Sequence, residues 1–110
     1  MAALAIGNVV LLPFPYSDLK VSSVRPAFVI QITSHGDAVV CMITTQGYGD
    51  RNIVTIPPAE QQLSKLNSPS VVRYTKLATV SPKNFCGILG SFSPEFTRAI
   101  QATLAYWIQS

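Results

Sequence analysis

Short apolar runs, each closed off by turn-forming residues, follow one another along most of this chain. The runs are rich in Val and Ile, which favour strands, and most are too short for an ordinary helix. They span residues 9–12, 27–32, 38–45, 52–56, 71–77 and 85–90. The connections at 34–37 and 47–50 are tight turns, so antiparallel hairpins are expected. We therefore predict a mainly β or α+β fold, with five or six strands in a small barrel or curled antiparallel sheet.

Only the C-terminal segment has the periodicity of a longer helix. Ser93 supplies an N-cap hydroxyl, and Pro94 and Glu95 suit the first helical turn. Apolar residues then recur every four positions, at Phe96, Ile100, Leu104 and Ile108, flanked by Ala99, Thr103 and Trp107. We predict a terminal amphipathic helix to about Gln109, with Trp107 packed in the core. Residues 59–66 are expected to hold one or two helical turns.

Composition excludes a disordered chain. Of the 110 residues, 48% are hydrophobic and only 12% are charged, against a usual value of about 25%. We predict one domain over residues 1–110, large enough to bury a core without disulfide or metal staples. A surface so poor in charge is expected to include an interface.

Charge and cysteine content bear weakly on partners and location. The net charge of +3 slightly favours an anionic partner such as nucleic acid. No apolar run approaches the roughly 20 residues of a membrane span, and the start lacks the features of a signal peptide. We therefore expect a cytoplasmic protein without a membrane partner. Cys41 and Cys86 lie in apolar stretches without metal-ligand spacing, which predicts buried free thiols.

Several blocks of sequence, taken in order, resemble one known family. Residues 7–19 read Gly-Asn-Val-Val-Leu-Leu-Pro-Phe-Pro-Tyr-Ser-Asp-Leu, and Arg-Pro-Ala follows at 25–27. Ile-Thr-Thr-Gln at 43–46, Ser-Val-Val-Arg at 70–73 and Lys-Leu-Ala-Thr-Val at 76–80 complete the set. This series resembles the PemK/MazF-type toxins, which are mRNA interferases of bacterial toxin–antitoxin pairs.

The resemblance implies a homodimeric SH3-like barrel that cleaves single-stranded RNA at a short sequence. Such cleavage needs no metal and no cofactor, because the 2′-OH of the RNA is the nucleophile and the products are a 2′,3′-cyclic phosphate and a 5′-OH. The implied partners are RNA and a cognate antitoxin protein, with DNA bound only through the antitoxin complex. The reaction requires a proton acceptor, a cation for the charged phosphorane and a donor to the leaving oxygen.

The family motifs map these roles onto particular residues of this chain. They imply catalytic roles for Arg25, Thr44, Arg73 and Asp18. RNA contacts are implied at Lys20, Ser22, Thr45, Gln46, Thr75 and Lys76. Without the motif, Arg25 and Arg73 are equally well read as solvated strand residues, Thr44 as a strand-closing residue and Gln46 as a turn cap. Thr45 is the alternative to Thr44 if the register differs by one.

The chain departs from the family pattern where a general base is expected. Some relatives have an aspartate two residues after the arginine that matches Arg73, but this chain has Thr75, which cannot act as a base near neutral pH. The family's early Gly-Asp is Gly-Asn here, at residue 8. His35 lies in a tight turn and is predicted to be exposed. Asp18 is left either to act as the base or to cap its loop.

Two other function classes remain open from the sequence. A binding module could keep this fold and its basic groove without turnover. Similar dimeric barrels also poison DNA gyrase through an aromatic C-terminal tail, but the predicted packing of Trp107 in the core argues against that role here.

Overall fold

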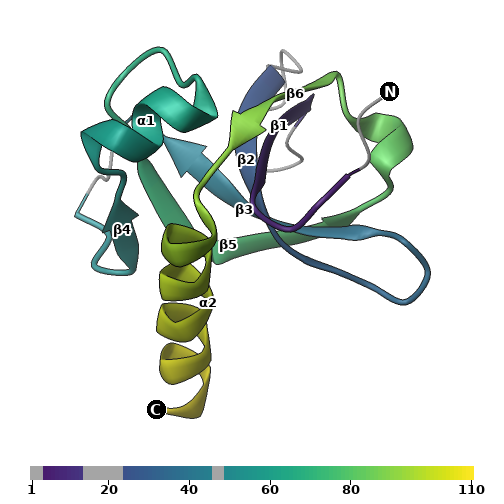
Figure 1. The fold of residues 1–110 in the computed structure, drawn as a ribbon. Helices are drawn as coiled ribbons and strands as arrows, with labels where there is room; N and C mark the ends of the chain where they lie inside the picture. Colours follow the sequence, from purple (N-terminus) through teal and green to yellow (C-terminus); the bar gives the residue numbers. More distant parts are fainter. Residues whose placement is uncertain (1–3, 14–23, 46–48) are drawn as a thin grey trace.

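The computed structural model describes residues 4–13, 24–45 and 49–110, which form six strands and two α-helices (Figure 1). The strands are β1 (Asn8–Pro13), β2 (Val24–Ile32), β3 (Ala38–Thr44), β4 (Ile53–Thr55), β5 (Val71–Val80) and β6 (Gly87–Ser91). The helices are α1 (Pro58–Ser64) and α2 (Pro94–Gln109), with a short 3₁₀ turn at Pro82–Asn84. The predicted strands and helices are thus all present, with bounds shifted by a few residues.

All six strands form one antiparallel sheet in the order β4-β5-β3-β2-β1-β6. The sheet is curled, and its edge strands β4 and β6 are not paired with each other, so it does not close. The predicted curled antiparallel sheet with a C-terminal helix is therefore confirmed. Strands that are consecutive in sequence pair with each other in β1-β2-β3 and in β4-β5. In addition, β5 pairs with β3, and β6 pairs with β1.

Alternating residues of the strands build a core on each face of the sheet. One face is covered by α2, which lies against β2 and β5. Its buried cluster includes Val9, Phe28, Ile30, Cys41, Ile43, Val72, Tyr74, Phe92 and Ile100. The other face buries Val10, Leu12, Ala27, Val29, Ala38 and Val40. The strand ends beyond this second core carry several of the polar residues that the sequence singled out.

The first turn of α2 is stabilised by the predicted N-cap and by a further contact with α1. The Ser93 hydroxyl accepts a hydrogen bond from the Phe96 backbone N–H at 3.1 Å, which is the expected N-cap. In addition, the Glu60 carboxylate of α1 accepts from both the N–H and the hydroxyl of Ser93, at 2.8 and 2.7 Å. These contacts tie the two helices together at the point where the chain leaves β6.

The far end of α2 extends past the sheet, so its apolar residues are less buried than predicted (Figure 1). Ile100 is fully buried, whereas Ile108 is 64% exposed. The prediction that Trp107 packs in the core is right only in part. Its ring meets Tyr74 edge-on with centroids 6.4 Å apart, but the side chain remains 43% exposed. None of the helices in the described residues is long and apolar enough to cross a membrane.

The two cysteines are both free thiols, as predicted, but only one is buried. Cys41 lies inside the core on β3, and burial raises the pKa of its thiol to about 12. The prediction of a buried Cys86 is wrong. This residue lies between the 3₁₀ turn and the edge strand β6, where nothing covers the outer side of the chain, and it is exposed.

Helix α1 approaches β6 so closely at Gly90 that only glycine fits there. A Cβ at this position would lie 2.5 Å from the Leu63 carbonyl oxygen and 3.0 Å from the Ser64 backbone carbons. We expect Gly90→Ala to lower the free energy of unfolding by about 1–3 kcal/mol, because backbone atoms cannot move aside cheaply. Gly87→Ala is the matched control in the same strand, since a Cβ at Gly87 meets nothing within 4 Å. Urea unfolding tests the pair, and equal stabilities of the two variants would contradict the packing described here.

Candidate functional site

The sheet register brings three of the predicted catalytic residues to one face of neighbouring strands. Met42 of β3 lies opposite Arg73 of β5, and Thr44 lies opposite Val71. On the other side of β3, Met42 lies opposite Ala27 of β2. Two residues further along each strand, Arg25 projects to the same face as Ala27, and Thr44 to the same face as Met42. Opposed residues of an antiparallel pair project to the same face, so Arg25, Thr44 and Arg73 share it.

Arg25 is half-buried, and its surroundings give it no counter-charge among the described residues. It lies opposite Leu12 of β1, which belongs to the core of the second face. Its Nε atom is buried and has no hydrogen-bond partner in that part of the chain. A buried polar group without an acceptor costs free energy, and a guanidinium in this state attracts an anion. Within the part of the chain that the structure describes, the Arg25 charge is therefore not balanced by a carboxylate.

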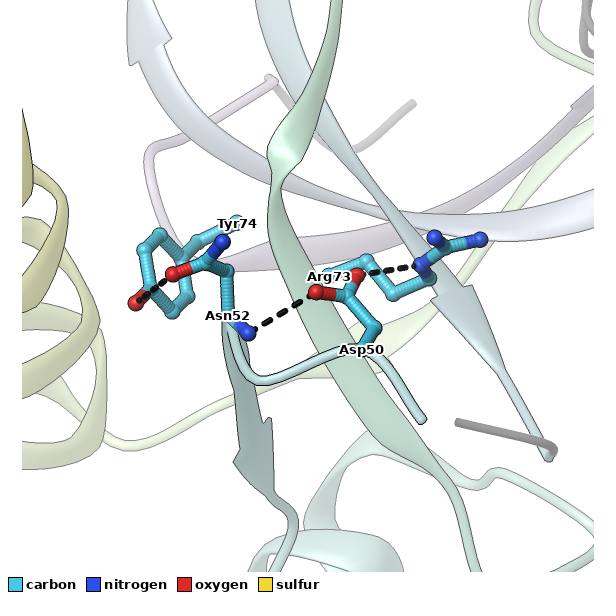
Figure 2. A network of polar contacts seen from close by, with 4 residues as sticks. All are labelled: Asp50, Asn52, Arg73 and Tyr74. Carbon is cyan, nitrogen blue, oxygen red and sulfur yellow. Dashed lines mark hydrogen bonds and ion pairs between the residues drawn. The ribbon is translucent and has the colours of Figure 1, made fainter. Parts of the chain in front are cut away.

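Arg73, in contrast, is held by a carboxylate from another part of the chain. Its Nε donates to Oδ2 of Asp50 at 2.9 Å, and the two side chains are 21% and 14% exposed. Figure 2 shows the two terminal nitrogens of Arg73 on the side away from Asp50. The same view shows the Tyr74 ring on the opposite side of β5 from the arginine, toward α2.

Asp50 is itself fixed by the turn that leads into β4. Its Oδ1 accepts a hydrogen bond from the Asn52 backbone N–H at 2.8 Å, and the Asn52 side-chain oxygen accepts from the Tyr74 hydroxyl at 3.1 Å (Figure 2). The Asn52 hydrogen bond, followed by that from Arg73, lowers the pKa of the Asp50 carboxyl below its ordinary value, and the positive charge of Lys76 acts in the same direction. Asp50 is therefore ionised at neutral pH.

The remaining predicted residues of the described chain are more spread out. Thr45 follows Thr44 and lines a cavity of about 330 Å³ together with Leu11 and Pro26. Those two residues alternate with Leu12 and Arg25 along their strands, so Thr45 belongs to the other face of the sheet.

Thr75 and Lys76 lie in an irregular part of β5. Along β3 the register shifts between Cys41, which lies opposite Leu77, and Met42, which lies opposite Arg73. Thr75 is half-buried and Lys76 is exposed. A bulge thus lies between Arg73 and Leu77, while burial alternates regularly from Val71 to Thr75.

Four predicted site residues lie outside the described residues, namely Asp18, Lys20, Ser22 and Gln46. His35 is exposed in the β2–β3 turn, as predicted. Within residues 4–13, 24–45 and 49–110, no three His, Cys, Asp or Glu side chains are grouped so that they could hold a metal ion.

Sequence reasoning missed Asp50 as a site residue. It gave Asp50 no separate role within the loop of residues 46–50, although Asp-Arg-Asn at 50–52 is the kind of sequence that forms an Asx turn. That pattern predicts the bond to Asn52. It does not predict the partner Arg73, which lies 23 residues further along the chain.

Comparison with known proteins identifies the family. A family model described as "PemK-like, MazF-like toxin of type II toxin-antitoxin system" matches residues 5–108. The chain belongs to this toxin family. None of the curated proteins compared with this toxin-family chain matches it significantly by sequence.

Solved structures support the fold of this family member over nearly its whole length. A mycobacterial endoribonuclease in complex with its cognate antitoxin has a TM-score of 0.74 at 17% identity, over 97% of this chain and 96% of the other. A second mycobacterial endoribonuclease gives 0.71 at 18% identity, over 99% and 94%. The MazF protein of Deinococcus radiodurans gives 0.68 at 18% identity, over 96% of both chains.

Proposed function

We propose that this toxin is a sequence-selective, metal-independent endoribonuclease that cleaves single-stranded RNA. The observation that supports this most is the shared face of Arg25, Thr44 and Arg73, which gathers two cations and a hydroxyl at the ends of three adjacent strands. Family membership and the endoribonucleases among the similar structures support the same reaction class.

The proposed reaction is an internal phosphoryl transfer. The RNA 2′-oxygen attacks the adjacent phosphorus, the bond from phosphorus to the 5′-oxygen breaks, and a 2′,3′-cyclic phosphate forms. A base accepts the 2′-OH proton, and an acid gives a proton to the departing 5′-oxygen, so the net reaction neither gains nor loses protons. The negative charge that builds up on the nonbridging oxygens is what the protein must stabilise.

We propose that Arg25 stabilises the negative charge on the nonbridging oxygens. Its guanidinium is half-buried and has no carboxylate partner among the described residues. Loss of surrounding water strengthens its attraction for an anion, and its planar fork can contact two phosphate oxygens together. Thr44, on the same face of the sheet, is proposed to position the phosphate or ribose. Arg73 is proposed as a second phosphate contact.

Asp18 remains our proposal for the general base, on the strength of the family motif alone. Lys20, Ser22, Gln46, Thr75 and Lys76 are proposed to contact the RNA, as is Thr45 from its cavity on the other face. A chain with a net charge of +3 suits this polyanion.

The proposed partners follow the family. We infer a homodimer, which sedimentation at micromolar concentration tests, and an antitoxin that neutralises the activity, as one of the similar structures is bound to its cognate antitoxin. DNA is proposed to bind only through the toxin–antitoxin complex. The cytoplasm, where messenger RNA is translated, is the proposed location.

Incubation of the purified protein with a long mixed-sequence RNA in EDTA tests the function. We expect cuts within a short recurring sequence, with a 5′-OH on one fragment and a cyclic phosphate on the other, read by end-specific labelling. Activity that is lost on chelation and restored by Mg²⁺ or Mn²⁺ would refute the metal-independent mechanism. Binding without any cutting would favour a module that retains the fold but not the chemistry.

A further inference from the structure

We propose that Asp50 is a positioning residue that orients Arg73 for the phosphate, an inference that rests on the proposed function. Thr75, two residues after Arg73, has no carboxylate to offer, and the described structure supplies one from the β3–β4 connection instead. The contact joins residues 23 positions apart in sequence, so it fixes the arginine by tertiary structure and not by strand register.

Among the described residues, the contact with Asp50 uses only the Nε atom of the guanidinium and neither of its terminal nitrogens. Asp50 binds Nε at 2.9 Å, and Figure 2 shows both terminal nitrogens directed away from the carboxylate. An arginine side chain has several rotatable bonds, and ordering it on binding would cost conformational entropy. Because Asp50 holds Nε before a ligand arrives, the terminal nitrogens can meet an anion with less of that cost.

Asp50 can do this because a chain of hydrogen bonds anchors it to the core. The carboxylate accepts from the Asn52 backbone at 2.8 Å, and the Asn52 side chain accepts from the Tyr74 hydroxyl at 3.1 Å. Tyr74 is only 7% exposed and packs in the core under α2. The position of Arg73 is therefore defined by three linked groups, of which the last is rigidly packed.

Asp50 also lies within electrostatic range of Lys76, whose positive charge acts on the carboxyl in the same direction as that of Arg73. The carboxylate that orients Arg73 therefore lies near two basic residues of β5, both of which we propose to contact RNA phosphates.

The first test is the kinetics of Asp50→Asn on an RNA oligonucleotide that the wild-type protein cuts. We expect kcat to fall about 10- to 100-fold, the cost of a misplaced contact to the reacting group, with KM changed by less than about threefold. Asp37→Asn, in the β2–β3 turn, is the matched control and should stay within about twofold of the wild type. Equal kcat values for Asp50→Asn and the wild type would overturn the inference and leave the proposed function intact.

A double variant separates orientation of Arg73 from a general structural role. If Asp50 acts through Arg73, then Asp50→Asn should have little further effect in an Arg73→Ala background. If the decrease in kcat of the double variant instead equals the product of the two single-variant decreases, the residues act independently, and the inference would be overturned. Tyr74→Phe, which removes the anchoring hydroxyl, should give a smaller loss in kcat than Asp50→Asn.

A third readout does not depend on activity. In ¹⁵N-labelled protein, the Arg73 Nε–H signal should be sharp and slow to exchange with water, and Asp50→Asn should broaden or abolish it. An Nε–H signal unchanged in Asp50→Asn would overturn the proposed contact, whether or not the variant folds less stably. Failure of the wild-type protein to cut any RNA would instead overturn the proposed function and, with it, the catalytic part of this inference.

Discussion

Replacement of Arg25 by alanine is expected to lower the RNA cleavage rate by about 10²–10³, the usual cost of losing one preorganised donor to a developing anion. Among the described residues, Arg25 has no carboxylate to neutralise it, and its Nε lies buried without an acceptor. We therefore propose that this charge acts on the phosphorane. Single-turnover cleavage of a labelled oligonucleotide, with protein in excess, measures the chemical step directly.

RNA affinity should fall much less than the rate in Arg25→Ala. Other cations, including Arg73 and Lys76, are proposed to contribute to binding of the ground-state phosphates, and such contacts are partly interchangeable. Arg25→Lys should not restore the rate, because an ammonium group lacks the planar two-point fork. Thr44→Ala should also slow cleavage, but by a smaller factor, since a neutral hydroxyl donor is weaker than a charged one.

Arg98→Ala is the matched control, since Arg98 is an exposed arginine on α2. It removes the same charge from the chain and should leave the rate within about twofold of the wild type. Comparable losses of rate and affinity in Arg25→Ala would show that Arg25 is only a groove contact. The principal catalytic assignment would then pass to Arg73.

The parts of the fold that could be predicted from sequence are those set by local signals. The Ser93 N-cap and the proline that follows it correctly predicted where α2 begins, and the turn at 34–37 correctly predicted the β2–β3 hairpin. The pairings of β3 with β5 and of β1 with β6 join segments that are distant in sequence, so no turn residue predicts them. The exposure of Cys86 depends on its position at a sheet edge, which those pairings determine.

In the candidate site too, some features could be predicted from the sequence, whereas others depend on contacts between distant segments. Family motifs identified Arg25, Thr44 and Arg73, and the strand register then brought them onto one face. Alternation along β5 could not predict the register shift against β3 that lies between Arg73 and Leu77. Nor could the sequence predict that Asp50 binds Arg73, since that contact depends on how the turn before β4 packs beside β5.

The second large effect is expected from the substrate. A single 2′-deoxy nucleotide on the 5′ side of the cut removes the nucleophile, so cleavage at that bond should fall by well over about 10³. Binding should change little, because the phosphates that dominate affinity are all retained.

The most direct measurement compares two oligonucleotides that differ only in this 2′-OH, each incubated with the wild-type protein in EDTA. We expect a 5′-OH fragment from the all-RNA strand and an intact 2′-deoxy strand that still competes for binding. Cleavage of the 2′-deoxy strand at the same bond would contradict the proposed mechanism, because the attacking oxygen would then have to come from water or from the protein.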